Sequence, residues 1–446
     1  MNTLHRAVHR AVHRALAPAI LAVLIVAAAV PAQAPRAADD PVVIGFIGSF
    51  SSDTGLSSLR GAEIAIEELN ETGGALGGRQ IKLVSADTRE DVTEGIKAYE
   101  YLNEVEKVDF IVSGSIDDVS LGWLPRMAEY RTPTLDTWTS YIGIIDKVVE
   151  EYDTYKMYFM NIACDYALAT LYVDFGKDIL AGKMGWKSTV ILQEDTAFGG
   201  GVQELVAELL APESGIEVLD TIVYDTQTVD FAPIFSKTAA MKPDFMYLIS
   251  SVNSQVPSSQ YVKLQVPVPM TGINVAAFGL DFWNDTGGAG GGTSTLSPIP
   301  AAGMELDDVS AAFAAKYQAK YGGSRPIFPH FNGFNAYHGV KNAIAAAERA
   351  GGFEPLDDWV REMENTDVKL YKDGELWHRY AYWKRGEIEP RTGREYTHNI
   401  KFDVTPPYDD GAPSMVVIQW YVDGSARVVY PPKYANGEFS VPPWIQ

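Results

Sequence analysis

Small hydroxyl side chains directly follow a short apolar run at residues 110–112. The sequence Ser-Gly-Ser at 113–115 interrupts this run, and apolar residues at helical spacing resume at 119–130. This order predicts a buried strand, a tight turn and a helix, which is half of a parallel α/β unit. Ligands bind at the carboxyl ends of strands in such folds. Ser113, Ser115 and the N–H groups at the helix start could therefore hold an anion such as a carboxylate, although a turn that binds nothing uses the same residue types.

The same order of elements is repeated around this stretch. Short connections between strands and helices imply a parallel sheet with helices on both faces. Three strand ends carry hydroxyl residues, at 49–54, 113–115 and 137–140, which predicts a polar cleft along one edge of the sheet. The predicted strands are 42–47, 81–84, 110–112 and 133–135, and the predicted helices are 59–70, 91–105 and 119–130.

The middle of the chain follows the same scheme. Its strand ends at 193–199 and 250–255 again carry polar and hydroxyl residues. We therefore expect an α/β fold of two similar Rossmann-like lobes, each with a parallel central sheet. The predicted strands of this part are 187–192, 216–224 and 245–249, and the predicted helices are 168–180, 201–210 and 231–241.

The N-terminal segment, residues 1–34, has the pattern of a secretory signal peptide. Three arginines precede an apolar core at 19–30, and an A-x-A cleavage site follows at 32–34. The core is shorter than the roughly 20 residues that a membrane span needs, although an uncleaved anchor is the alternative. The mature chain is expected to be soluble in the periplasm or outside the cell.

Composition narrows the function classes. The chain has 446 residues, which favours two lobes over one domain. Its formal net charge of −22 argues against nucleic acid or an anionic membrane as a partner. The single cysteine, Cys164, excludes an intramolecular disulfide and is expected to be a small buried residue.

Signatures of catalysis and of metal binding are missing from the sequence. It contains no P-loop, no HExxH, no GxSxG and no paired CxxC. His330 and His338 lie off the spacing of metal ligands, and the acidic pair Asp117-Asp118 is typical of a solvated helix start. We therefore expect a protein that is not an enzyme and needs no cofactor or metal. An extracellular hydrolase on an α/β scaffold is the enzymatic alternative.

Several strings occur in a characteristic order along residues 40–350. They are VVIGFIGSFSSDTG, RGAEIAIEELNETGGALGGRQIKLVSADT, VDFIVSGSIDDVS, EDTAFGGGVQE and TVDFAPIFSKTAAMKPDFMYLI. In this order they resemble the leucine/isoleucine/valine-binding protein family, the type I periplasmic solute-binding proteins of ABC transporters. The ordered series is more specific than any one of the strings.

The resemblance implies a two-lobed clamp that closes over one small molecule and delivers it to an ABC transporter permease in the inner membrane. The expected oligomeric state is a monomer. The alternative is a ligand-sensing receptor of a signalling system, for an amide or an amino acid. The resemblance also implies a three-strand hinge, with crossings near Met160, 294–298 and 376–381; lobe one would hold 40–159 and 297–376, and lobe two 160–296 and 377–446.

The resemblance also implies ligand contacts from lobe one. In relatives a serine after the third strand and a loop after the fourth hold the α-carboxylate of an amino acid. Ser115, two residues after Ser113, occupies the first position in this chain, and Trp138, Thr139 and Ser140 occupy the loop. Relatives usually have a small residue where Trp138 stands, so its side chain could line the pocket or flank it.

The contacts implied for lobe two depart from the family at one position. Phe198 matches an aromatic residue that closes over the ligand, and Ser251 lies in a loop that matches another pocket edge. Asn274 stands where the branched-chain amino acid binder has an acidic partner for the ligand ammonium, and an unpaired buried ammonium is costly. Asp165 could replace that partner, although a helix N-cap is the alternative role. The expected ligand is a branched-chain or other amino acid, or an aromatic or other organic acid.

Overall fold

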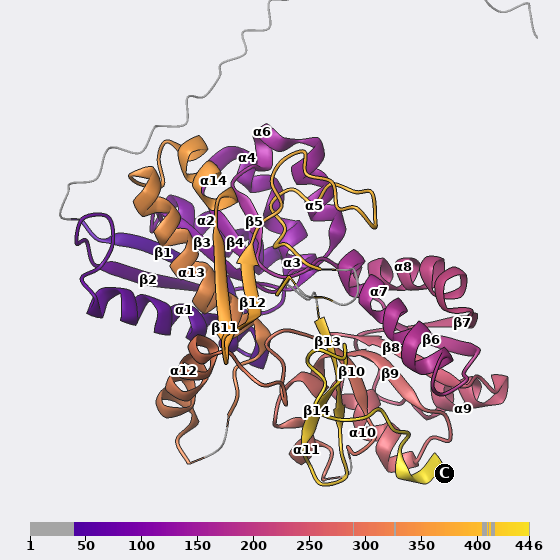
Figure 1. Cartoon of the computed structure of the whole chain (residues 1–446). Coiled ribbons are helices and arrows are strands. Elements are labelled where there is room, and N and C mark those ends of the chain that lie inside the picture. Colours follow the sequence, from indigo (N-terminus) through magenta and orange to yellow (C-terminus); the bar gives the residue numbers. More distant parts are fainter. Residues whose placement is uncertain are drawn as a thin grey trace, which may run out of the picture. The chain divides into compact units, whose positions relative to one another are not determined.

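The computed structural model describes residues 40–288, 290–324, 327–403, 408, 410–411 and 415–445. The predicted signal peptide, residues 1–34, lies outside these described residues. In the part of the chain that is described, no helix is long and apolar enough to cross a membrane. The framework of this part consists of two parallel sheets and two smaller antiparallel sheets (Figure 1).

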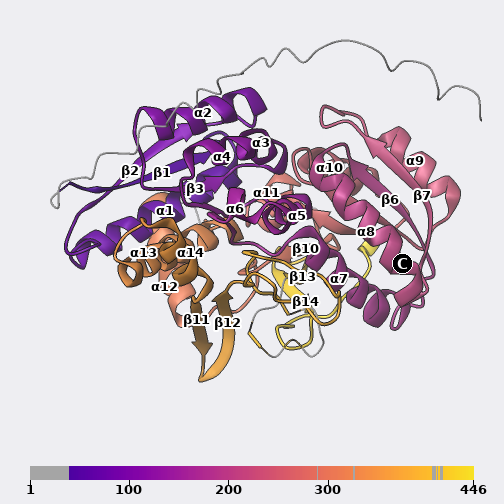
Figure 2. The ribbon, with the colours of Figure 1, turned by 90° about the horizontal axis from the view of Figure 1, so that it is seen from above.

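The first parallel sheet has the strand order β2-β1-β3-β4-β5. In its register Ile44 lies beside Phe110, and Ile111 lies beside Thr134. Every residue of β1 is buried, because α1 and α13 pack together on one face and α2 and α3 on the other (Figure 2). The strands are β1 (Val42–Gly48), β2 (Ile81–Asp87), β3 (Phe110–Gly114), β4 (Thr134–Asp136) and β5 (Tyr158–Met160).

The second parallel sheet has the order β7-β6-β8-β9, and β9 lies next to β10 of the antiparallel sheet β10-β13-β14. Strands β11 and β12 form a separate antiparallel pair. These strands are β6 (Ser188–Glu194), β7 (Glu217–Tyr224), β8 (Phe245–Ser250), β9 (Met270–Asn274), β10 (Ser294–Pro298), β11 (Asp367–Lys372), β12 (Glu375–Ala381), β13 (Met415–Trp420) and β14 (Ala426–Tyr430).

Most predicted elements are present, but several helix predictions differ from the structure, and three of the differences have a clear local cause. The helix predicted to start at 59 begins at Asp53, because Ser52 caps it by accepting the N–H of Gly55 at 3.2 Å. The helix predicted at 119–130 is interrupted at Pro125. Asp165 is not the cap of its helix; Cys164 holds that position.

The helices of the first part are α1 (Asp53–Glu71), α2 (Val92–Glu104), α3 (Asp117–Trp123), α4 (Met127–Tyr130), α5 (Ile142–Glu150), α6 (Tyr152–Tyr155) and α7 (Asp165–Phe175). Those that follow are α8 (Ala197–Ser214), α9 (Ala232–Met241), α10 (Gln255–Leu264), α11 (Phe282–Asp285), α12 (Asp308–Tyr317), α13 (Phe331–Ala350) and α14 (Leu356–Glu364).

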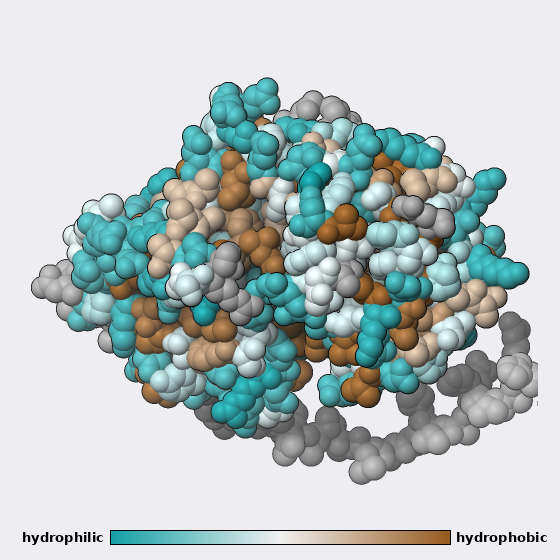
Figure 3. All heavy atoms as spheres, turned by 90° about the horizontal axis from the view of Figure 1, so that it is seen from below, coloured by the Kyte–Doolittle hydropathy of each residue, from teal (hydrophilic) through white to brown (hydrophobic). Residues whose placement is uncertain are grey.

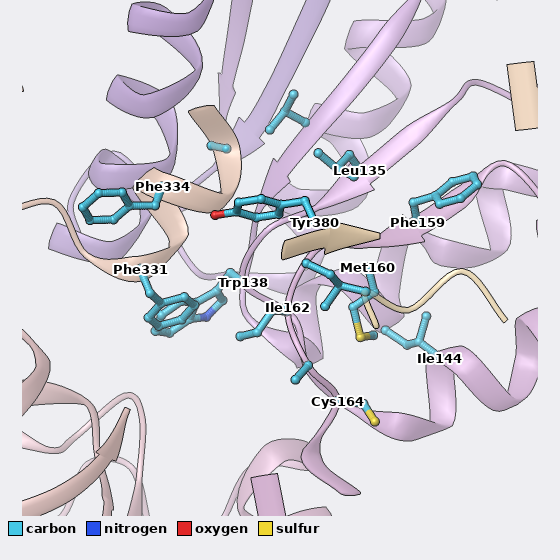
Figure 4. Close-up of a cluster of buried hydrophobic side chains, with 14 of the residues drawn as sticks. Leu135, Trp138, Ile144, Phe159, Met160, Ile162, Cys164, Phe331, Phe334 and Tyr380 are labelled. Atoms are coloured by element: carbon cyan, nitrogen blue, oxygen red, sulfur yellow. The ribbon is translucent and has the colours of Figure 1, made fainter. Parts of the chain in front are cut away.

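The largest hydrophobic core takes side chains from both parallel sheets, including β1 and β3 of the first and β6 and β8 of the second. Figure 4 shows part of it, where Leu135, Met160 and Tyr380 come together from β4, β5 and β12. On the face shown in Figure 3, hydrophilic side chains lie around the edge and hydrophobic ones gather nearer the middle.

The segment 382–403, after β12, contacts both α5 and α7. Arg391 donates to the Asp174 carboxylate of α7 at 2.6 and 2.9 Å, and Arg394 donates to Asp146 of α5 at 2.7 Å. This segment thus ties α5 and α7 to one another. The lobe boundaries expected from the sequence stay a prediction.

Candidate binding site between the two parallel sheets

A cavity lies between the carboxyl ends of the two parallel sheets. It has about 500 Å³ of space not filled by protein atoms, a volume that includes open solvent. Segments after β3, β4 and β5 line one side, and segments after β6 and β8 and around the end of β9 line the other. The lining residues are Ile116, Asp117, Asp118, Trp138, Ser140, Ile162, Leu168, Thr196, Phe198, Ser251, Val252, Ile273, Val275, Phe278, Pro298, Phe331 and Met415.

Aromatic side chains form one wall of this cavity. Trp138 follows β4 and stacks on Phe331 at the start of α13, with ring centroids 5.4 Å apart and an interplanar angle of 13° (Figure 4). Phe278, after β9, meets Phe331 at 70° with centroids 5.9 Å apart. Such pairs contribute about 0.5–1.5 kcal/mol beyond their burial. The wall therefore offers a preformed surface for a flat or apolar group.

The carboxyl group of Asp136 holds the Trp138 loop in place. Its Oδ1 accepts the backbone N–H groups of Trp138 and Thr139 at 3.1 and 2.9 Å, and its Oδ2 accepts the Ser120 hydroxyl at 3.0 Å. Burial raises the pKa of Asp136 to about 6, and these hydrogen bonds oppose the shift. With both oxygens bonded, Asp136 positions the loop and does not line the cavity.

Asp117 lines the cavity, so the prediction of a solvated helix start was wrong for this residue. It is 6% exposed, and its Oδ1 accepts the backbone N–H groups of Ser140 and Tyr141 at 2.9 and 2.8 Å. Burial is the main reason that the pKa of Asp117 rises to about 7, and the nearby Asp136 and Asp118 raise it further. A buried carboxyl group at a strand end is therefore part of the site.

The opposite side of the cavity is positioned by Glu194 and Thr196. Glu194 ends β6, and its Oε2 accepts the Ser251 N–H at 2.7 Å, the Ser251 hydroxyl at 3.0 Å and the Val252 N–H at 2.9 Å. Thr196 caps α8 by accepting the N–H of Gly199 at 3.0 Å, and the first turn of that helix carries Phe198 to the cavity.

Four of the residues predicted from the sequence come together at the cavity. Trp138 and Ser140 line it from the first sheet, and Phe198 and Ser251 line it from the second. Ser140 uses its backbone N–H to hold Asp117, and within the described residues its hydroxyl makes no hydrogen bond. These four positions follow strands of both sheets, as ligand-binding residues of α/β folds do.

Three predicted residues of the first sheet do not line the cavity. Ser113 accepts the N–H of Ser115 at 3.3 Å, and the Ser115 hydroxyl donates to the Ile47 carbonyl at 3.4 Å. The Thr139 hydroxyl donates to the Ser115 carbonyl at 3.0 Å. These short side chains form hydrogen bonds between neighbouring strand ends. They therefore stabilise the loops that line the cavity and do not contact it themselves.

Asp165 and Asn274, predicted as alternative partners for a ligand ammonium, are also away from the cavity lining. Asp165 is fully buried; its Oδ1 accepts the N–H of Ile142 at 3.1 Å and its Oδ2 has no partner. Burial raises the pKa of Asp165 to about 8. The Asn274 side chain donates to the Ser258 hydroxyl at 2.7 Å.

Comparisons with known proteins show that the chain is similar to solute-binding proteins. The family described as periplasmic binding protein matches residues 41–381. A solute-binding protein of an ABC transporter from Rhodopseudomonas palustris, in complex with benzoate, has a TM-score of 0.69 at 16% identity, with 90% of this chain and 99% of that one covered. A comparison with curated protein sequences finds no match.

Two amino acid binders have the same fold. The branched-chain amino acid transporter substrate-binding protein of Streptococcus pneumoniae, in complex with isoleucine, has a TM-score of 0.66 at 16% identity, with 88% of this chain and 100% of that one covered. A leucine-binding protein from Thermotoga maritima has a TM-score of 0.67 at 19% identity, with 88% and 99% covered. The resemblance and the two-lobed α/β fold expected from the sequence are thereby confirmed.

Proposed function

The chain belongs to the periplasmic binding protein family, and we propose that it is an extracytoplasmic solute-binding receptor of an ABC importer. Its solute is a small carboxylate-bearing molecule, either a branched-chain or other amino acid or an aromatic or other organic acid. The observation that carries this proposal is the cavity between the carboxyl ends of the two parallel sheets. The receptor acts as a monomer in the periplasm and delivers the solute to a permease in the inner membrane.

The aromatic wall supports a solute with a flat or apolar body. Trp138 and Phe331 are already stacked, so a ring or branched alkyl group can pack against them without a rearrangement. Benzoate in the Rhodopseudomonas palustris protein and isoleucine in the Streptococcus pneumoniae protein are solutes of these two kinds. The same fold thus binds solutes of both classes that the proposal includes.

The end of the cavity near α8 supports binding of a carboxylate. The first N–H groups of a helix have no partners within it and favour negative charge, and α8 is a helix of 18 residues that begins at the cavity. The hydroxyl groups of Thr196 and Ser251 add polar atoms at the same end. Among the described lining residues none is Lys, Arg or His, so neutral donors carry the recognition.

Solute binding would couple to hinge closure. The cavity takes lining residues from both parallel sheets, and a solute that contacts both sides is held more tightly when they are closed around it. Differential contact of this kind gives the closed form its stability, and the closed form is what a permease would recognise.

A thermal-shift screen of the mature chain tests the proposal. The panel contains amino acids, short amides, and aliphatic and aromatic carboxylates. A solute present at a hundred times its dissociation constant stabilises the folded state by about 2.7 kcal/mol, which shifts the melting temperature visibly. A hit among amino acids or carboxylates supports uptake. If no member of the panel shifts the melting temperature, the proposal fails.

A further inference from the structure

Asp117 presents one unsatisfied carboxylate oxygen to the cavity. Its Oδ1 is anchored by the backbone N–H groups of Ser140 and Tyr141. Its Oδ2 accepts no hydrogen bond from the described residues, although more than nine-tenths of the side chain is buried and the residue lines the cavity. This oxygen is not among the buried polar atoms that lack a partner, so it is accessible from the cavity. It is therefore available to accept a hydrogen bond from a bound solute.

The surroundings of Asp117 are acidic. Asp118, the next residue, also lines the cavity, and Asp136 lies close enough to act on the Asp117 charge. The Asp117 charge also raises the pKa of Asp165, at the start of α7. A solute carboxylate at this end would therefore meet like charges, whereas a cation would be attracted.

We infer that the solute presents a protonated nitrogen, such as a primary ammonium or an amidinium, to Oδ2 of Asp117 while its flat or apolar body packs against Trp138 and Phe331. The inference rests on the proposed function and deepens it. The solute carboxylate then lies at the opposite end of the cavity, near Thr196 and the start of α8. Asp117 is thus the residue that selects nitrogen-bearing solutes over plain acids.

The two sides of the cavity favour opposite charges. The Asp117 side offers an acceptor fixed by two backbone N–H groups, and the α8 side offers helix N–H groups and the Thr196 hydroxyl. A solute with a cationic and an anionic end would satisfy both sides at once. Charge-assisted hydrogen bonds are about twice as strong as neutral ones, so the cationic end should dominate selectivity at the Asp117 side.

The protonation state of Asp117 adds a pH signature. Burial raises the pKa of Asp117 to about 7, and a cationic solute would favour the ionised form. Affinity for a cation should therefore increase as the pH rises through 7, while affinity for a neutral solute of the same shape should change less. The other titratable groups that act on Asp117 or respond to it are Asp118, Asp136, Asp165, Tyr141 and Tyr158.

Calorimetric titration of the mature chain with matched aromatic probes tests the inference. The probes are benzylamine (a cation at neutral pH), benzamide (neutral), benzoate (anionic) and 4-(aminomethyl)benzoate (with both charges). At about pH 8, benzylamine should bind about tenfold or more tightly than benzoate, because a hydrogen bond between charged groups replaces a like-charge contact. The probe with both charges should bind most tightly.

Substitution of Asp117 distinguishes a direct contact with the solute from the general negative charge around the cavity. Asp117→Asn should weaken benzylamine binding about tenfold while benzamide binding changes by less than about threefold. Asp118→Asn, which removes the same charge one residue further along α3, should weaken benzylamine binding by clearly less than Asp117→Asn does, because the direct hydrogen bond to Asp117 remains. Equal losses in the two variants would overturn the assignment to Asp117.

The unmodified chain supplies a test that does not depend on folding of the variants. Benzylamine affinity that rises between about pH 5.5 and pH 8, with benzamide affinity unchanged, supports the inference. Benzoate binding more tightly than benzylamine overturns it and leaves uptake of carboxylates standing. Failure of every probe, together with no hit in the thermal-shift panel, overturns both proposals.

Discussion

Asp117 and Glu194 are acidic side chains at corresponding places on opposite sides of the cavity, but their hydrogen bonding differs. Glu194 ends β6 and is fully buried; its two oxygens accept the N–H groups of Ser251, Val252 and Asn253 at 2.6–2.9 Å and the Ser251 hydroxyl at 3.0 Å. Asp117 follows β3 and accepts two N–H groups through Oδ1 alone.

The difference separates a structural role from a role in recognition. A buried carboxylate whose oxygens are all bonded has no capacity left for a solute, and it fixes the loop whose N–H groups it accepts. A carboxylate that is anchored through one oxygen is held still while the other oxygen stays available. Glu194 therefore shapes the cavity, and Asp117 is placed to contact what enters it.

The largest effect is expected from Glu194→Ala. It leaves the N–H groups of Ser251, Val252 and Asn253 without their acceptor, and the free energy of unfolding should fall by about 3 kcal/mol. Asp117→Ala, which removes the acceptor of only two N–H groups, should cost about 1–2 kcal/mol. Urea denaturation of both variants gives the two values, and a larger loss for Asp117→Ala would contradict the division of roles.

Asp165 is a third buried acidic residue to compare with Glu194 and Asp117. Its Oδ2 has no hydrogen-bond partner, and the residue does not line the cavity. Burial raises its pKa to about 8 in the folded state, against about 4 in the unfolded chain. The folded state therefore binds the proton more tightly, so the Asp165 contribution to stability is greatest below about pH 4 and is lost as the pH rises toward 8.

Asp165→Asn should remove this loss because an amide does not ionise in that range. Between pH 6 and pH 8 the free energy of unfolding of the unmodified chain should fall by about 2–3 kcal/mol more than that of the variant. Urea denaturation at the two pH values measures the difference. Equal pH dependence in both proteins would mean that Asp165 is ionised in the folded state.

The aromatic wall gives a third and smaller effect. Phe331→Leu keeps an apolar side chain but removes the ring that stacks on Trp138 at 5.4 Å. Stability should fall by about 1–2 kcal/mol, and affinity for aromatic probes should fall about fivefold relative to aliphatic ones. Calorimetric titration with an aromatic and an aliphatic solute of equal charge tests this, and an equal loss for both would assign the wall a packing role only.

The sequence predicted the sheets well because strands such as β1 and β8 are continuous apolar runs, which only burial on both faces explains. It also predicted the strand ends at which Trp138, Ser140, Phe198 and Ser251 line the cavity. Both results depend on local patterns and on the rule that ligands bind at the carboxyl ends of parallel strands.

The hydrogen bonding at those strand ends could not be predicted in the same way. Whether Ser115 faces the cavity or donates to the Ile47 carbonyl depends on a contact between residues far apart in the sequence. Phe331 was missed because it meets Trp138 only after the fold has formed. Asp117 did carry a signal, since it lies two residues beyond Ser115, but an acidic pair at a helix start is more often solvated.

Ser140→Ala is expected to have the smallest effect and to isolate solute contact from structure. The backbone N–H of Ser140, which anchors Asp117 at 2.9 Å, remains in the variant. Only the hydroxyl at the cavity is lost, so stability should change by less than about 0.5 kcal/mol. If the solute bonds to that hydroxyl, its affinity should fall by about 1 kcal/mol, which is roughly fivefold. Because Asp117 keeps its anchor, the ratio of benzylamine to benzoate affinity should stay unchanged, and a changed ratio would show that Ser140 also contributes to charge selection.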